Sequence, residues 1–128
     1  MKKIVLVLLL FFVACSNSED AREPHITTIS SLQAQELIAL GDVLILDVRT
    51  AAEFAEGHIY SAILLPYDVV GTYSPEILTD KTQTILVYCR AGRRSLIAAE
   101  KLQELGFAVI YNLDGGLNSW CGPLEMLR

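Results

Sequence analysis

The sequence predicts an α/β domain in which a parallel β-sheet has helices on both faces. Short apolar runs typical of buried strands alternate along the chain with segments that carry helical spacing or helix caps. Glycines follow three of the expected helices, where a C-terminal cap belongs. The alternating region begins near residue 25 and covers about 100 residues, which is enough for one hydrophobic core.

The first half of this region contains two strand–helix pairs. Residues 26 to 29 form a short strand, and a capping-box pattern at Ser30 and Gln33 opens a helix that ends at Gly41. We expect its core-facing side chains to be Leu32, Leu37, Ile38 and Leu40.

The next strand covers residues 43 to 48 (VLILDV), an apolar run with one acid. Thr50 and Glu53 repeat the capping-box pattern, so we expect a short helix over residues 50 to 56, closed by Gly57.

The second half repeats the alternation. Strands are expected at residues 63 to 65, 85 to 88 and 108 to 111, and a helical turn at residues 74 to 76. The clearest helix covers residues 95 to 105, and after residues 114 to 116 we expect a short terminal helix. The residues at helical spacing in the clearest helix are Leu96, Ala99, Leu102 and Leu105.

The N-terminus has the pattern of an export signal. A basic start is followed by an apolar run at residues 4 to 14, too short to span a bilayer, which takes about 20 residues. The run ends in Phe-Val-Ala-Cys, which resembles the lipobox of bacterial lipoproteins. That resemblance implies a signal peptide at residues 1 to 14 and lipidation of Cys15; the alternative is ordinary cleavage nearby, with Cys15 an incidental thiol.

Residues 15 to 24 then form the lipid attachment site and a polar tether, and residues 25 to 128 form the folded domain. We expect a protein that is anchored by lipid in a bacterial cell envelope and faces the periplasm. Ser16, by resemblance to enterobacterial lipoproteins, favours the outer membrane over the inner one.

Charge and cysteine content exclude several function classes. Loss of residues 1 to 14 removes two lysines and no acids, which leaves 8 basic and 15 acidic residues, a net charge of −7. Such a chain is unsuited to binding nucleic acid. Beyond Cys15 the thiols are Cys89 and Cys121, and His25 and His58 are far apart, so we expect neither a metal site nor a cofactor.

The segment Cys-Arg-Ala-Gly-Arg-Arg-Ser at residues 89 to 95 carries the predicted chemistry. It links a strand to the clearest helix, at the sheet edge where ligands of α/β folds gather. Helix N–H groups, the flexible backbone of Gly92 and three arginines all favour an anion on Cys89. Because the thiolate is the nucleophilic form of cysteine, Cys89 is the candidate nucleophile.

Two anion chemistries fit this loop: phosphate ester cleavage through a phosphocysteine, and sulfur transfer through a persulfide. Cysteine phosphatases resemble one another in a Cys-x5-Arg loop. In this sequence Ser95 has the position of that arginine, and the loop is Cys-x4-Arg, ending at Arg94. The shorter loop makes a smaller cradle and favours sulfur transfer.

Residues 89 to 95 resemble the active loop of rhodanese-type sulfurtransferases. Residues 46 to 59 (LDVR, a glutamate, GHI) and residues 113 to 120 (LDGG, then tryptophan) resemble two further motifs of that family. An exported chain with one such domain is similar to the phage-shock periplasmic type.

The resemblance implies a rhodanese-like fold, with a five-stranded parallel sheet between helices. It implies that Cys89 accepts sulfane sulfur from thiosulfate or a related donor and passes it to cyanide or a thiol. The donor-binding loop residues would be Arg90, Ala91, Gly92, Arg93 and Arg94. We expect a monomer, and the alternative function is a docking or redox-sensing module with little turnover.

Four further residues receive a structural interpretation. Asp47, at the end of a buried strand, needs a partner, and Arg49 or a backbone amide is the simplest one. His58 lies in a turn and is expected to be structural. Cys121 is expected to be an inert thiol; the alternative is that it forms a disulfide with oxidised Cys89.

Overall fold

The computed structural model describes residues 25–72 and 76–127. The predicted signal peptide, Cys15 and the tether lie outside the described residues, as do Ser74 and Pro75 of the predicted turn. The elements are β1 (His25–Ile29), α1 (Ser31–Leu40), β2 (Val43–Asp47), α2 (Ala51–Glu56), β3 (His58–Ile59), β4 (Ile63–Leu64), the 3-10 turn η1 (Glu76–Leu78), β5 (Thr84–Tyr88), α3 (Arg93–Glu104), β6 (Val109–Leu113), the 3-10 turn η2 (Gly116–Ser119) and β7 (Leu124–Glu125).

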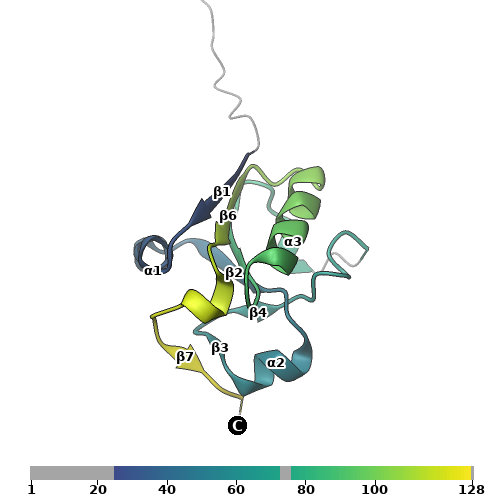
Figure 1. Ribbon diagram of the computed structural model, residues 1–128. Coiled ribbons are helices and arrows are strands. Elements are labelled where there is room, and N and C mark those ends of the chain that lie inside the picture. Colours follow the sequence, from purple (N-terminus) through teal and green to yellow (C-terminus); the bar gives the residue numbers. More distant parts are fainter. Residues whose placement is uncertain (1–24, 73–75, 128) are drawn as a thin grey trace, which may run out of the picture.

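Five strands form a parallel sheet in the order β1-β6-β5-β2-β4 (Figure 1). The predicted fold class is therefore confirmed. β5 lies at the centre between β2 and β6, so the loop that follows it opens at the middle of the carboxyl edge. The chain after Trp120 adds β7, which pairs antiparallel with β3.

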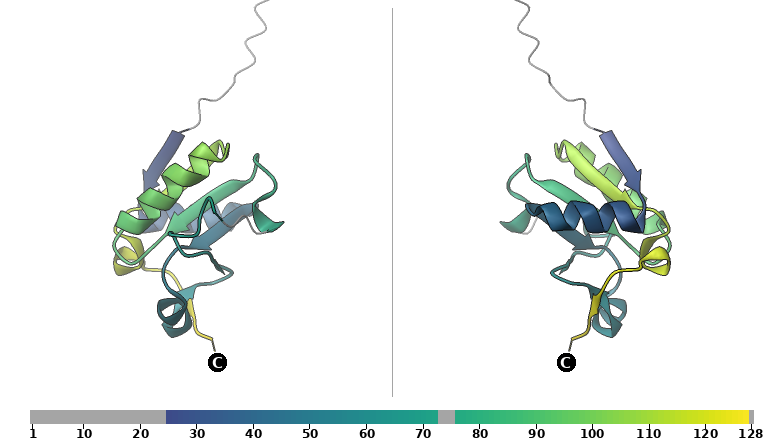
Figure 2. Two further views of the ribbon diagram at one scale, coloured as in Figure 1. Left: turned by 90° about the vertical axis from the view of Figure 1, so that its right-hand side faces the viewer. Right: turned by 90° about the vertical axis from the view of Figure 1, so that its left-hand side faces the viewer.

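Helices cover both faces of the sheet: α3 lies on one face and α1 on the other (Figure 2). Alternate residues of β5 point to opposite faces, so Ile85 and Val87 pack in the core with α3 while Leu86 and Tyr88 pack in the core with α1. The central strand is thus buried on both sides, as its continuous apolar sequence predicts.

The inward faces of the two long helices differ from the prediction in part. In α1 the buried residue is Ala34, whereas Leu32 and Leu40 are exposed. In α3, Leu96 is also exposed, and Ser95 and Ala98 are buried with Ala99 and Leu102. Small residues mark the buried face of each helix, because they allow the helix to approach the sheet closely, and a pattern read from leucines alone misses most of them.

The predicted capping box of α1 is confirmed. The Ser30 hydroxyl accepts the Gln33 N–H at 3.2 Å, and the Gln33 side-chain oxygen accepts the Ser30 N–H at 2.9 Å. No helix in the described part of the chain is long and apolar enough to cross a membrane.

Candidate active site

The loop after β5 turns into α3 two residues earlier than predicted. α3 begins at Arg93, and Gly92 is its N-cap, with φ of 102°. This left-handed conformation is one that glycine adopts without a steric cost from a side chain. The turn therefore consists of residues 89 to 92, while Arg93, Arg94 and Ser95 form the first turn of the helix.

This tight turn wraps around the sulfur of Cys89. The thiol is buried, and its Sγ accepts the Gly92 N–H at 3.0 Å. Sγ also lies 3.5 Å from the Ser95 Oγ, which in turn lies 3.1 Å from the Gly92 carbonyl oxygen. Ser95, which has the position of the phosphatase arginine, thus contacts the sulfur directly.

These contacts favour the thiolate. Burial alone raises the pKa of the Cys89 thiol, but the Ser95 hydroxyl and the backbone N–H groups of Ser95, Gly92 and Ala91 outweigh it, so the pKa is lower than that of an ordinary cysteine. The sequence also predicts a lowered pKa for Cys89, but it attributes the lowering to the arginines as much as to the backbone N–H groups.

A pocket of about 350 Å³ opens at the sulfur. Its lining combines cationic side chains with apolar and aromatic ones. The lining residues are Tyr67, Cys89, Arg90, Ala91, Arg93, Arg94 and Ile97. The structure therefore brings four of the five predicted loop residues to the pocket; the fifth, Gly92, contributes its N–H to the sulfur.

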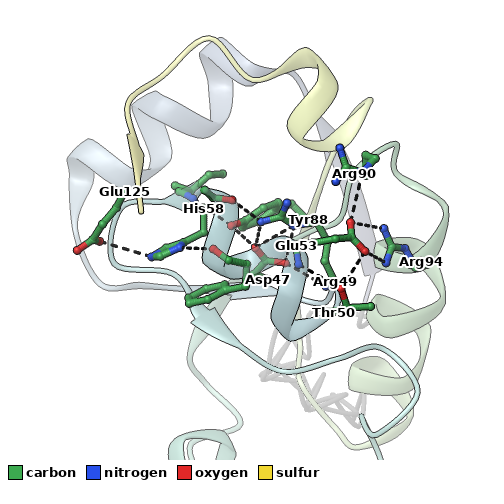
Figure 3. Close-up of polar contacts among 12 residues, drawn as sticks. Asp47, Arg49, Thr50, Glu53, His58, Tyr88, Arg90, Arg94 and Glu125 are labelled. Atoms are coloured by element: carbon green, nitrogen blue, oxygen red, sulfur yellow. Dashed lines mark hydrogen bonds and ion pairs between the residues drawn. The ribbon is translucent and has the colours of Figure 1, made fainter. Parts of the chain in front are cut away.

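Glu53 on α2 pairs with two of the three loop arginines. Its carboxylate accepts two hydrogen bonds from Arg94, at 2.8 and 3.0 Å, and lies 3.3 Å from the Arg90 Nε (Figure 3). The Arg94 hydrogen bonds lower the pKa of Glu53 to about 2, so it is ionised at neutral pH.

This role of Glu53 is absent from the prediction, which assigned Glu53 to the cap of α2. Thr50 does cap the helix, because its hydroxyl accepts the Glu53 N–H at 3.2 Å. The carboxylate, however, accepts hydrogen bonds from Arg90 and Arg94, which lie about forty residues further along the chain. A local sequence pattern contains no signal for such a pairing.

Asp47 and Arg49 form a buried pair beside the site, as predicted. Arg49 donates to Asp47 through Nη2 at 2.6 Å, and the same carboxylate accepts the Tyr88 hydroxyl at 2.6 Å (Figure 3). Tyr88 in turn accepts the Ile59 N–H at 3.0 Å, and Arg49 reaches the Gly57 carbonyl at 2.6 Å. The network ties the ends of β2 and β5 to the segment that carries β3.

The contacts of His58 agree with a structural role. Its ring stacks on Phe54 with centroids 3.7 Å apart, and its Nδ1 lies 2.9 Å from the Phe54 carbonyl oxygen. Its Nε2 lies 3.7 Å from the Glu125 carboxylate on β7 (Figure 3). These contacts join α2 and β3 to the C-terminal segment.

The glycine pair after β6 supports the cysteine loop. Gly116 lies directly against the backbone of Cys89 and Arg90, where even a Cβ would collide. The following N–H groups continue the contact: Leu117 donates to the Cys89 carbonyl at 2.8 Å, and Asn118 donates to the Arg90 carbonyl at 3.0 Å. The sequence predicts a turn at this glycine pair but not this contact.

Cys121 is exposed and, like Cys89, a free thiol in the structure. Its N–H donates to the Ser31 hydroxyl at 2.9 Å, and its Sγ lies 3.6 Å from the Ser119 carbonyl oxygen. The disulfide between the two cysteines stays a prediction.

Comparison with known proteins agrees with this geometry. The model of the rhodanese-like domain family matches residues 30–123. A sulfurtransferase of Allochromatium vinosum is 38% identical over 68% of this chain and 79% of its own length. The thiosulfate sulfurtransferase GlpE of Coxiella burnetii is 39% identical over 72% of this chain and 84% of its own length.

Among solved structures, a rhodanese with anions from E. coli is 33% identical, with a TM-score of 0.61 over 66% of this chain and 99% of that one. The family match includes the strand, the tight turn and the helix start that hold Cys89, together with Glu53 and the glycine pair. On these grounds the chain belongs to the family of rhodanese-like domains and has sulfurtransferases among its relatives.

Proposed function

We propose that the protein transfers sulfane sulfur from thiosulfate or a related donor to cyanide or a thiol, with Cys89 as the carrier. The observation that carries the proposal is the buried Sγ, which accepts the Gly92 N–H at 3.0 Å and faces a pocket lined by arginines. This arrangement suits a sulfur that is negatively charged both before and after it accepts a second sulfur.

The first step breaks the S–S bond of thiosulfate. The Cys89 thiolate attacks the outer sulfur and forms a new S–S bond, and the electron pair of the broken bond leaves with sulfite. The enzyme becomes a persulfide anion, which the N–H groups of Ala91, Gly92 and Ser95 are positioned to stabilise. Cyanide or a thiolate then attacks the terminal sulfur and restores the Cys89 thiolate, giving ping-pong kinetics.

Mass spectrometry of the intact protein tests the proposal directly. Incubation with thiosulfate should add the mass of one sulfur atom, and subsequent cyanide should remove it with formation of thiocyanate. Cys89→Ser should show neither change. Cys121→Ser is the matched control, and it should both gain the sulfur atom from thiosulfate and lose it to cyanide. Sulfur addition to Cys89→Ser, or none to the unmodified protein, would contradict the mechanism.

We also propose that the protein is anchored by lipid on Cys15 in the bacterial envelope, with the outer membrane favoured. The sequence of residues 1 to 16 supports this. Metabolic labelling with a radioactive fatty acid should mark the full chain, and Cys15→Ser should remove the label. An unlabelled wild-type chain in the soluble periplasmic fraction would contradict the proposal.

A further inference from the structure

The three arginines of the cysteine loop are in different electrostatic states. Arg94 and Arg90 both face the carboxylate of Glu53, so part of their charge is already balanced within the protein. Arg94 is the more firmly held, because it makes two charge-assisted hydrogen bonds and its side chain is only 26% exposed.

Arg93 has a different environment. It is exposed, it lines the pocket, and it forms no ion pair with any residue in the described ranges 25–72 and 76–127. As the first residue of α3 it also lies where the helix N-terminus already attracts anions. Its charge is therefore the least compensated of the three beside Cys89.

We propose that Arg93 is the residue that recognises the anionic part of the sulfur donor, while Glu53 holds Arg94 and Arg90 as a wall of the pocket. This inference rests on the proposed function and assigns the specificity of its first step. A donor such as thiosulfate directs its outer sulfur to Cys89, and its negatively charged oxygens meet the guanidinium of Arg93.

Two sulfur donors that differ in charge test whether Arg93 recognises the anionic part of the donor. Thiosulfate is a dianion, whereas methanethiosulfonate presents the same reactive sulfur on a monoanion. The electrostatic energy scales with the charge of the ligand, so Arg93→Gln should raise the half-saturating concentration of thiosulfate about tenfold and that of methanethiosulfonate about threefold. The maximal rate of persulfide formation should change little, because the groups around the sulfur remain.

The measurement is persulfide formation without acceptor, followed by intact mass at increasing donor concentration. Arg90→Gln should raise the half-saturating concentration less than Arg93→Gln, because Glu53 already balances Arg90. Lys81→Gln is the control for net charge: Lys81 lies over the Phe107 ring, outside the residues that line the pocket, and this variant should behave as wild type.

The outcomes separate this inference from the proposed function. If the wild type forms no persulfide, the proposed function fails. If the wild type forms persulfide but Arg93→Gln keeps the wild-type half-saturation, or changes it equally for both donors, the assignment of Arg93 is overturned. A larger effect of Arg90→Gln than of Arg93→Gln would overturn it as well.

Discussion

Two kinds of positive group surround the sulfur of Cys89: backbone N–H dipoles and the full charges of arginines. The N–H of Gly92 and the hydroxyl of Ser95 lie within hydrogen-bond distance of Sγ. Arg94 and Arg90 instead direct their guanidinium groups to Glu53. The local groups therefore favour the thiolate, and the arginines define the charge of the pocket around it.

Ser95→Ala tests whether the groups that hydrogen-bond to the sulfur favour the thiolate. The substitution removes the side-chain hydrogen bond that lowers the pKa of Cys89 and leaves burial, which raises it. Because the thiolate fraction rises with pH, the alkylation rate of Cys89 should reach its plateau at a higher pH than in the wild type. At pH 7 the rate should fall by about tenfold, since a hydrogen bond to a charged group contributes about 1.5 kcal/mol or more and about 1.4 kcal/mol corresponds to a factor of ten.

Alkylation by iodoacetamide across a pH series, read by peptide mass spectrometry, gives this profile. Cys121 in the same sample is the internal control, and its profile should be unchanged in the variant. An identical Cys89 profile in wild type and Ser95→Ala would contradict the role of the hydroxyl.

At the scale of elements, β2 and β5 are joined by polar side chains as well as by the sheet. The carboxylate of Asp47 at the end of β2 accepts hydrogen bonds from Arg49 and from Tyr88 at the end of β5. Both Asp47 and Arg49 are almost completely buried. Each charge is tolerated inside the protein only because the other compensates it.

Asp47→Asn should therefore lower the free energy of unfolding by about 3 kcal/mol, because it leaves the guanidinium of Arg49 buried without its counter-charge. Urea denaturation followed by circular dichroism measures the loss. Glu36→Gln on the exposed side of α1 removes the same charge from the surface and should change the free energy by less than about 0.5 kcal/mol. Equal effects in the two variants would contradict the account.

Glu53 joins α2 to the start of α3, and this link depends on pH. The pKa of Glu53 falls from 4.5 to about 2, mainly through the hydrogen bonds from Arg94. A lowered carboxylate pKa stabilises the folded state fully above the unfolded-state value, and this contribution is lost as pH falls from about 4.5 towards 2.

Glu53→Gln should therefore lower the free energy of unfolding by about 1 to 2 kcal/mol at pH 7, with partial solvent screening taken into account. At pH 3 the difference between variant and wild type should shrink to less than half. Urea titrations of both proteins at the two pH values give the comparison. A difference that stays constant with pH would show that the carboxylate acts through packing and not through its charge.

For the whole molecule, the sheet order explains which parts of the sequence meet. β6 lies next to β5, so the segment after β6 comes to the loop after β5, although the two are separated by the whole of α3. In the same way β2 lies on the other side of β5 and brings Glu53, just beyond it, to the arginines. The site is assembled from three strand ends.

This assembly separates what the sequence can predict from what it cannot. Strands, helix caps and the candidate nucleophile are indicated by patterns that span only a few neighbouring residues. A short stretch of sequence is therefore enough to predict the capping box at Ser30 and the position of the Cys89 loop. The pairing of Glu53 with Arg94 and the contact of Gly116 with Cys89 depend on strand order. A resemblance to a family identifies such residues as part of a shared motif. Their contacts, and so their physical roles, follow only once the order of the strands in the sheet is known.

Gly116→Ala tests the contact between the two loops. A Cβ at this position would lie 2.7 Å from the carbonyl carbon of Arg90, so the cysteine loop or the segment after β6 must move. Gly106 is the matched control, because it too has positive φ, 97° against 57° for Gly116, but a Cβ there would meet nothing within 4 Å.

Gly106→Ala should lower the free energy of unfolding by about 1 to 2 kcal/mol through backbone strain alone, and should leave persulfide formation intact. Gly116→Ala should add the cost of the displaced backbone, a further 1 to 3 kcal/mol, and should also slow persulfide formation, because the Gly92 N–H no longer lies at the sulfur. Urea denaturation and intact mass after thiosulfate give the two measurements. Equal stability and equal rates in the two variants would mean that the loop after β6 does not support the cysteine loop.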